Sequence, residues 1–284
     1  MEENNTIKLS NGSILGVAEY GIPSGKPLFF FHGWPSSRLQ AKVIDGSAKK
    51  LGIRVISIDR PGYGLSDFVE DRGLLDWPAE VIEVADILKI KKFSVIGVSG
   101  GGPYAAVCAY KIPDRLIKVG IVVGLAPTDV KGVLEGMSFI NKLAWRSYNS
   151  TPWLRELASL LHLSQVRKII PYFSSLAFRA KADRRIMSKK VKEEMIRNRE
   201  EAFRQGKKAV AQDLKIYTED WGFSLSKIKS KVMLWYGADD KNVSVNMGKY
   251  YAAKIPNSEL VIYPNEGHLL IWRHSDEILK SLRS

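Results

Sequence analysis

Short apolar runs alternate along this chain with longer stretches of helical periodicity. The runs are apolar throughout rather than at every second position, which is typical of parallel strands covered by helices on both faces. Residues 78–90 instead repeat their apolar positions at helical spacing, and Pro78 stands near the start, where a helix tolerates proline. The pattern predicts strands within 27–33, 54–62, 93–100 and 118–124.

The first twenty residues show a different pattern. Asn11-Gly12 separates two strand-like runs within residues 6–21. Asn-Gly between such runs is the strongest short-range signal for a hairpin. We therefore expect the sheet to begin with an antiparallel hairpin.

The strand pattern stops after Pro127 and resumes at 231–237 and 259–264, on either side of the helix-like segment 245–255. The intervening block is rich in Leu, Trp, Lys and Arg and has helical character. The fold class expected is α/β, with a mostly parallel sheet, an antiparallel N-terminal hairpin, helices on both faces and an inserted helical cap. The predicted core comprises residues 1–127 and 231–284, and the predicted cap comprises residues 128–230.

Composition indicates a globular protein with a large core. The chain has 284 residues, 45% of them hydrophobic, enough for one large domain with an insertion. The N-terminus MEENNTIKLSNG lacks the basic and then apolar residues of a signal peptide, and no run is long enough to span a bilayer. Cys108 is the single cysteine, which excludes an internal disulfide and favours a cytoplasmic location. We expect Cys108 to be a core residue and, with four scattered histidines, no metal site.

The net charge of +13 is concentrated in one region. Residues 131–230 carry 21 Lys and Arg against 10 Asp and Glu. Within them acids and bases alternate at helical spacing, as on a solvated helix face. We therefore expect a small-molecule substrate, no nucleic-acid partner, no stable membrane insertion, and a monomer or homodimer.

A glycine-rich turn follows the predicted strand at 93–98. It does not fit a P-loop, because Pro103-Tyr104 follow Gly102 where Lys and Ser/Thr are required. It also fits a dinucleotide-binding turn poorly, because the next strand ends without an acidic residue. Residues 97–101 instead match G-x-S-x-G, the nucleophile elbow between a strand and a helix.

The elbow predicts a nucleophilic serine. Gly97 and Gly101 satisfy the need for small residues two positions before and after Ser99, where the tight turn brings the chain into contact. The helix that follows favours negative charge near the serine oxygen. A serine hydroxyl also needs a base to accept its proton, and the base needs a carboxylate to orient it.

His268 is the histidine placed to act as that base, because it directly follows the last predicted strand. His32 precedes the serine, whereas the fold requires the order Ser, acid, His. The acid lies on a loop after a strand. Asp240 is favoured, with Asp239 and Asp129 as alternatives.

Four ordered motifs resemble those of the α/β-hydrolase fold superfamily over nearly the whole chain. Besides the elbow, FFFHGWPSS at 29–37 is similar to the family's H-G-x-P loop and DRPGYGLSD at 59–67 to the turn after its fourth strand. GADD at 237–240 and EGHLL at 266–270 resemble its acid and histidine loops. The resemblance implies Asp240 as the acid, since it ends a G-x-x-D pattern. It also implies a cap inserted after strand 6.

By the same resemblance, the backbone N–H groups of Trp34 and Gly100 form the oxyanion hole, and His32 orients the loop. A serine at the elbow distinguishes the chain from epoxide hydrolases and haloalkane dehalogenases, which carry aspartate there. The Asp59-Arg60 and Asp67 cluster is expected to pin its own turn rather than take part in chemistry.

The substrate pocket is the least determined part of the prediction. The candidate contact residues are His32, Trp153, Leu157 and Trp221. Leucines recur at helical spacing after Trp153 and indicate the inner face of the cap. These are Leu154, Leu157, Leu160 and Leu161.

The resulting hypothesis is a cofactor-free serine hydrolase that cleaves a carboxylic ester or related acyl substrate. The apolar cap residues favour small-to-medium uncharged esters. Hydrolysis of a carbon–carbon bond in a diketone-like substrate is the nearest alternative. A ligand-binding receptor that retains the fold is a second alternative, because a fold does not determine its function.

Overall fold

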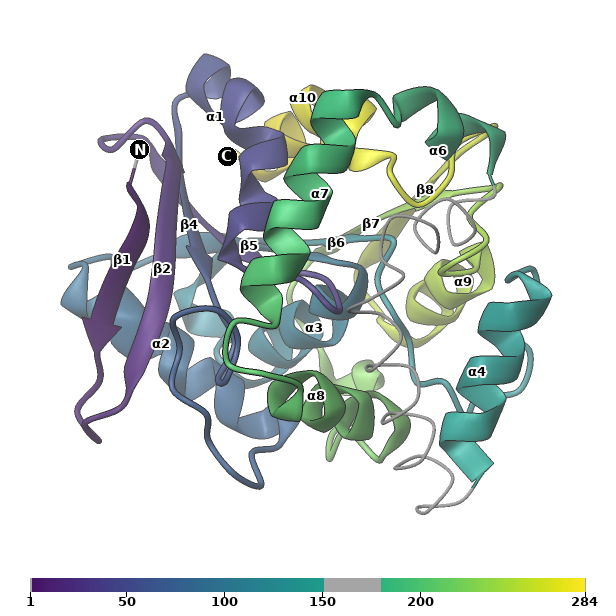
Figure 1. The fold of residues 1–284 in the computed structure, drawn as a ribbon, viewed down its shortest axis with the longest axis horizontal. Coiled ribbons are helices and arrows are strands. Elements are labelled where there is room, and N and C mark those ends of the chain that lie inside the picture. Colours follow the sequence, from purple (N-terminus) through teal and green to yellow (C-terminus); the bar gives the residue numbers. More distant parts are fainter. Residues whose placement is uncertain (1, 151–179, 284) are drawn as a thin grey trace.

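The structure, a computed structural model, describes residues 2–150 and 180–283. In this part of the chain, eight strands form one sheet with the order β1-β2-β4-β3-β5-β6-β7-β8 (Figure 1). The strands are β1 (Glu2–Lys8), β2 (Ile14–Gly21), β3 (Lys26–Phe31), β4 (Ile53–Ile58), β5 (Phe93–Val98), β6 (Leu116–Val122), β7 (Val232–Gly237) and β8 (Ser258–Tyr263).

The expected hairpin is present at one edge of the sheet. β1 pairs antiparallel with β2, and the turn between them is closed by Leu9 N–H donating to Ser13 O at 2.8 Å. Gly12 has φ +88° in this turn, a conformation that glycine adopts without strain. β2 is also antiparallel to β4, and all later pairings are parallel. The predicted α/β class with its N-terminal antiparallel hairpin is confirmed.

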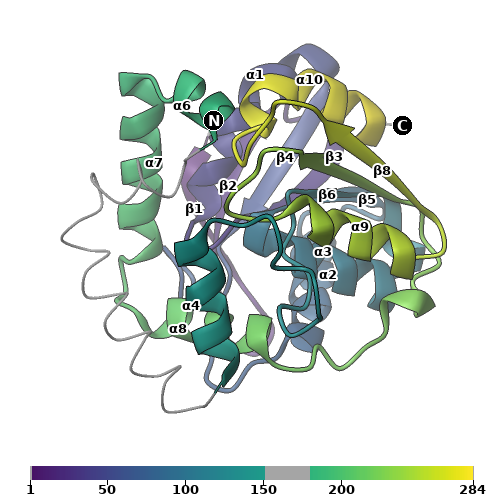
Figure 2. The same ribbon diagram turned by 90° about the vertical axis from the view of Figure 1, so that its right-hand side faces the viewer.

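Helices cover both faces of the sheet, which explains why its central strands β3 to β7 are largely apolar. α1 (Asp45–Leu51) and α10 (Ile271–Leu282) pack on one face, while α2 (Trp77–Ile87), α3 (Gly102–Lys111) and α9 (Val245–Lys254) pack on the other (Figure 2). Successive strand residues point to opposite faces. In β3, Phe29 and Phe31 therefore join the core under α2 and α3, whereas Leu28 and Phe30 join the core under α1.

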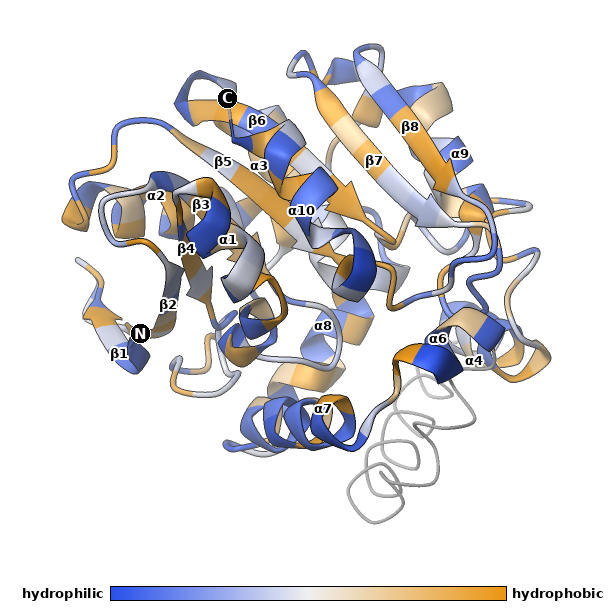
Figure 3. Cartoon of the chain, turned by 90° about the horizontal axis from the view of Figure 1, so that it is seen from above, coloured by the Kyte–Doolittle hydropathy of each residue, from blue (hydrophilic) through white to orange (hydrophobic). Residues whose placement is uncertain are grey.

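Between β6 and β7 the described residues form helices and no strand. These helices are α4 (Phe139–Ser150), α6 (Lys181–Ile186), α7 (Lys189–Ala202) and α8 (Lys208–Thr218). Figure 2 shows α4, α7 and α8 together on one side of the molecule. α7 is largely hydrophilic, in contrast to the strands (Figure 3). The residues predicted to form the inner face of the cap lie outside the described residues, namely Trp153, Leu154, Leu157, Leu160 and Leu161.

No helix in the described ranges is both long enough and apolar enough to cross a membrane. Cys108 lies in α3 and is fully buried, as expected of a core residue.

Candidate active site

Ser99 lies at the carboxyl end of β5, directly before α3, and has φ +54°. This left-handed conformation is uncommon outside glycine, and such strain concentrates at functional sites. The neighbouring glycines make the turn possible. A Cβ on Gly97 would lie 2.1 Å from Gly101 O, and one on Gly101 would lie 2.1 Å from Phe31 O. The contacts expected from the G-x-S-x-G spacing are therefore present.

His268 is held by Asp240. The His268 Nδ1 and Asp240 Oδ2 atoms are 2.8 Å apart, and the Asp240 carboxylate is fully buried. Burial lowers the pKa of His268, but the charge and hydrogen bond of Asp240, with the charge of Asp183, outweigh burial and raise that pKa above its ordinary value. Ser99 and His268 line the same cavity.

The two aspartates of the GADD motif have different surroundings. Asp240 Oδ1 accepts the backbone N–H groups of Asn242 and Val243 at 2.7 and 3.0 Å, which turns its side chain inward. Asp239 is exposed, and so is Asp129. The structure thus brings Asp240, and neither alternative acid, against His268.

The backbone of Trp34 lies beside that of Gly100. A Cβ on Gly100 would lie 3.0 Å from Trp34 N. Tyr217 of α8 donates its hydroxyl to Gly100 O at 2.9 Å. Two N–H groups on adjacent backbones next to a nucleophile are an arrangement that can stabilise an oxyanion.

His32 is fully buried and is not among the residues that line the cavity. Its Nδ1 lies 2.9 Å from Gly33 O and so donates to it, while Nε2 accepts the backbone N–H of Arg60 at 3.2 Å. Burial lowers the pKa of His32 well below its ordinary value, and the charge of Arg60 adds to this. A neutral ring bonded to backbone on both sides orients the loop and does not reach the cavity as a substrate contact.

A buried charged cluster of Arg60, Arg72 and Asp213 packs against the loop that follows β3. Arg60 donates to the carbonyls of His32 and Gly33 and forms an ion pair with Asp213 of α8 at 2.7 Å. Arg72 pairs with the same carboxylate. Burial raises the pKa of Asp213, but the two arginines outweigh burial and hold that pKa well below its ordinary range.

Sequence reasoning did not single out Asp213, although a signal was present. It stands among Val210, Leu214 and Tyr217 on the buried stripe of α8, where an ionised residue requires partners. The expected role of the other turn residues agrees with the structure. Asp59 Oδ2 accepts Leu65 N–H at 3.0 Å, and Asp67 Oδ2 accepts Ile14 N–H at 2.8 Å.

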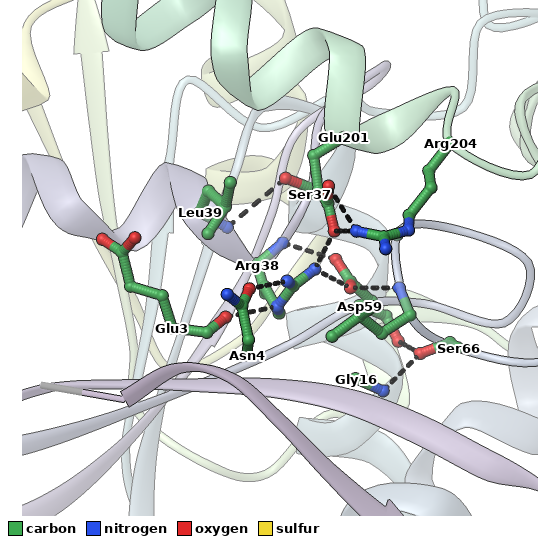
Figure 4. A network of polar contacts seen from close by, with 12 residues as sticks. Glu3, Asn4, Gly16, Ser37, Arg38, Leu39, Asp59, Ser66, Glu201 and Arg204 are labelled. Atoms are coloured by element: carbon green, nitrogen blue, oxygen red, sulfur yellow. Dashed lines mark hydrogen bonds and ion pairs between the residues drawn. The ribbon is translucent and has the colours of Figure 1, made fainter.

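α7 is attached to the core through a second polar network, centred on Arg38 (Figure 4). The guanidinium of Arg38 is fully buried and contacts Asp59 at 2.6 Å and Glu201 of α7 at 2.7 Å. Asn198, one turn earlier on α7, accepts the Ser37 hydroxyl at 2.7 Å. These contacts position α7 over the loop that follows β3.

The cavity has a volume of about 620 Å³ and lies between this loop, α7 and the start of α10. α7 contributes both charged and uncharged residues to its wall, namely Lys192, Glu194, Met195, Ile196, Arg197, Asn198 and Arg199. In the described part of the chain, no carboxylate forms an ion pair with Arg199. Burial lowers the pKa of the Arg199 guanidinium from its ordinary value. Because the ordinary pKa of arginine is so high, the side chain remains a cation at neutral pH.

Lys192 and Arg197 are exposed, as expected of a solvated basic helix, and apolar residues such as Met195 and Trp272 make up much of the wall. The partly buried Arg199 on the same wall was not expected. Helical spacing shows which residues share a face but not what that face covers. Trp221 is not on the cavity wall either: it is buried against Phe223 and Tyr251. Trp153 and Leu157 fall outside the described residues.

Among the described residues, no group of three or more His, Cys, Asp or Glu side chains is arranged to hold a metal ion.

The family model of the alpha/beta hydrolase fold matches residues 26–275, and the chain therefore belongs to that family. A 2-hydroxy-6-oxo-6-phenylhexa-2,4-dienoate hydrolase from Burkholderia cepacia is 28% identical over 234 residues, 79% of this chain and 74% of that protein. A 2-hydroxy-6-oxononadienedioate/2-hydroxy-6-oxononatrienedioate hydrolase from Comamonas testosteroni is 26% identical over 240 residues, 81% of this chain and 76% of that protein.

Solved structures share the fold at lower identity. The esterase EaEST from Exiguobacterium antarcticum superposes with a TM-score of 0.78 at 19% identity, covering 99% of this chain and 100% of that one. At this identity the similarity concerns the fold alone.

Proposed function

We propose that the protein is a serine hydrolase in which Ser99, His268 and Asp240 act as a catalytic triad on an acyl substrate. The observation that carries the proposal is the shared cavity of Ser99 and His268, with His268 Nδ1 2.8 Å from Asp240 Oδ2. The core of residues 1–127 and 231–284 carries the triad, and residues 128–230 form the cap. Cytoplasmic location and a monomeric or homodimeric state remain predictions from the sequence.

In the proposed reaction the Ser99 hydroxyl attacks the carbonyl carbon and His268 Nε2 takes its proton. Asp240 stabilises the imidazolium, and the N–H groups of Trp34 and Gly100 bind the oxyanion, each such donor contributing about 3 kcal/mol. His268 then gives the proton to the leaving group, and the bond between carbonyl carbon and leaving group breaks. Water releases the acid from the acyl-enzyme by the same steps.

Replacement of the nucleophile tests this assignment. Ser99→Ala is expected to abolish hydrolysis of a short-chain aryl ester without changing the far-UV circular dichroism spectrum. A fluorophosphonate probe is expected to label the wild type and the surface variant Ser281→Ala, but not Ser99→Ala. Wild-type turnover by Ser99→Ala would exclude the triad, and failure to label the folded wild type would favour the receptor alternative.

Our primary substrate proposal is a carboxylic ester. To the sequence-based expectation of an uncharged ester we add the testable alternative that its acyl or alcohol part carries an anionic group. Arg199 supports this addition, because a partly buried cation that has no carboxylate partner among the described residues is stabilised by a ligand anion. A charged hydrogen bond of this kind contributes about 1.5–3 kcal/mol, roughly a factor of 10 to 150 in kcat/KM.

A matched pair of neutral and carboxylate-bearing aryl esters tests the role of Arg199. Arg199→Gln is expected to lower kcat/KM at least tenfold for the anionic ester and less than twofold for the neutral one. Lys189→Gln removes the same charge from the exposed face of α7 and is expected to affect neither. Equal losses for both esters in Arg199→Gln would contradict an anionic substrate.

Carbon–carbon bond hydrolysis is the second candidate. The Burkholderia cepacia and Comamonas testosteroni relatives are named for 2-hydroxy-6-oxo acids, and such a substrate brings the carboxylate that Arg199 would bind. Side-by-side assays of the anionic aryl ester and 2-hydroxy-6-oxo-6-phenylhexa-2,4-dienoate distinguish the two. A preference for the dienoate by several orders of magnitude in kcat/KM would replace the ester assignment.

A further inference from the structure

Asp183, in the short cap helix α6, is bonded to the loop that carries His268. Its Oδ2 accepts the backbone N–H of His268 at 3.1 Å, and its Oδ1 accepts that of Leu269 at 2.8 Å. The Asp183 side chain is buried, with 1% of the residue exposed. One carboxylate from the cap therefore serves both N–H groups of the histidine loop, which is 85 residues away in the sequence.

The absence of a side chain at Gly267 leaves room for the Asp183 carboxylate. A Cβ on Gly267 would lie 2.3, 2.5 and 2.6 Å from Oδ2, Cγ and Oδ1 of Asp183, and these are its three nearest atoms. The glycine before His268 thus leaves the volume that Asp183 fills. Gly267 has no positive φ, so alanine at this position meets a steric obstacle in Asp183 rather than backbone strain.

Asp183 also adds a second negative charge near the His268 imidazole, on the side of the cap. Asp240 contacts the ring from the loop after β7, whereas Asp183 of α6 contacts the backbone N–H of His268 and acts on the ring through its charge. The other charged residues that line the cavity are Lys42, Arg184, Lys192, Glu194, Arg197 and Arg199. Burial raises the pKa of Asp183, while its bonds from Leu269 and His268 and the charge of His268 partly offset this. The imidazolium is therefore stabilised by the cap as well as by the core.

We propose that Asp183 is a positioning residue through which the docked cap sets the orientation and basicity of His268. The inference rests on the proposed function of His268 as general base. The N–H groups of His268 and Leu269 lose their acceptor when α6 moves away. The loop that carries His268 therefore holds its catalytic position only while α6 is docked. Chemistry is thereby coupled to cap docking through a contact, not only through closure of the cavity.

Kinetics of Asp183→Asn test the proposal. The amide keeps the shape and one acceptor but loses the charge, and Glu193→Gln removes one charge from the exposed surface of α7 as a control. We expect kcat to fall at least tenfold, KM to change less than threefold, and the acidic limb of the rate profile to move to lower pH. The limb moves down because the lost carboxylate had raised the pKa of His268. An unmoved limb with kcat within twofold of wild type overturns the proposal.

A double-mutant cycle keeps the proposal falsifiable if Asp183→Asn folds poorly. Gly267→Ala alone is expected to displace the carboxylate and lower kcat as much as Asp183→Ala does. Gly267→Ala added to Asp183→Ala is expected to cost less than a further twofold, because the colliding atoms are gone. Additive losses would show that Gly267 and Asp183 act independently and would contradict the proposal.

A readout without turnover separates this inference from the proposed function. In the Ser99→Ala background, NMR of the imidazole and of the His268 and Leu269 amides is expected to show a lower His268 pKa and displaced amide signals in Asp183→Asn. If these signals do not change, the positioning role fails although the triad stands. If Ser99→Ala retains turnover, the triad fails, and the NMR result still decides what Asp183 does to His268.

Discussion

Replacing Asp213 with asparagine removes the carboxylate that Arg60 and Arg72 share in the buried cluster under the loop that follows β3. Arg60 and Arg72, at most 3% exposed, both form ion pairs with this carboxylate. Hydroxyl groups complete its shell. Tyr104 donates at 2.6 Å and Tyr63 at 2.9 Å, while the Tyr217 oxygen, whose proton goes to Gly100 O, lies 3.2 Å away.

The cost of Asp213→Asn follows from the charge that remains. Two buried guanidinium groups lose their common counter-ion while the shape of the side chain is kept, and breaking a buried pair in this way costs about 3–5 kcal/mol. That is a large share of the roughly 5–15 kcal/mol by which a domain is stable. A loss of 1 kcal/mol lowers the Tm of a domain slightly smaller than this chain by about 2–4 °C. The expected fall in the Tm of Asp213→Asn is therefore about 10 °C.

Urea unfolding followed by circular dichroism measures the effect, with Asp86→Asn as the control. Asp86 is 61% exposed and pairs with Arg115, and such surface pairs contribute at most about 1 kcal/mol. The pKa of Asp213 is lower in the folded protein than in the unfolded chain. Its contribution to the free energy of unfolding is therefore fully present above the unfolded-state pKa and is lost only as the pH falls through the folded-state pKa. The difference in the free energy of unfolding between wild type and Asp213→Asn should therefore be constant between pH 5 and 8. A loss below about 1 kcal/mol would refute the reasoning about buried charge.

Three further outcomes are expected. Gly101→Ala should abolish ester hydrolysis and lower the yield of folded protein, because its Cβ would meet Phe31 O at 2.1 Å; ordinary activity in that variant would show that the turn can relax. The raised pKa of His268 predicts that kcat/KM falls on the acidic side with an apparent pKa above the 6.5 typical of histidine; a pH series on the neutral ester measures it, and an apparent pKa below 6 contradicts it. Cys108, buried and with its thiol pKa raised by burial, should react with iodoacetamide only at the rate of unfolding, so rapid labelling of native protein would contradict its core position.

Local sterics made part of this site predictable from the sequence. The contact between Gly97 and Gly101 joins residues four positions apart, so five letters are enough to recognise the turn around Ser99. The strand runs were recognisable for a related reason. A strand buried on both faces needs apolar residues at every position, and that requirement is visible in the sequence without knowledge of the partners.

The resemblance to a G-x-x-D pattern favoured Asp240 over Asp239, and the folded loop gives the physical reason. Both residues follow β7, and their spacing alone leaves either side chain free to turn toward the core. The N–H groups of Asn242 and Val243 bind Asp240 and direct it inward, which leaves its neighbour in solvent. Such a turn depends on hydrogen bonds that the letters GADD do not specify.

The cap's contribution to the site was decided only by tertiary structure. Helical periodicity identified a polar face on α7 and charged residues on α6 but not what those faces cover. Arg199 of α7 lines the cavity and Asp183 of α6 binds the histidine loop because the fold places these two helices beside the loops that follow the parallel strands. Contacts between residues this far apart in sequence depend on how the whole chain packs, because neither segment alone carries a signal for its partner.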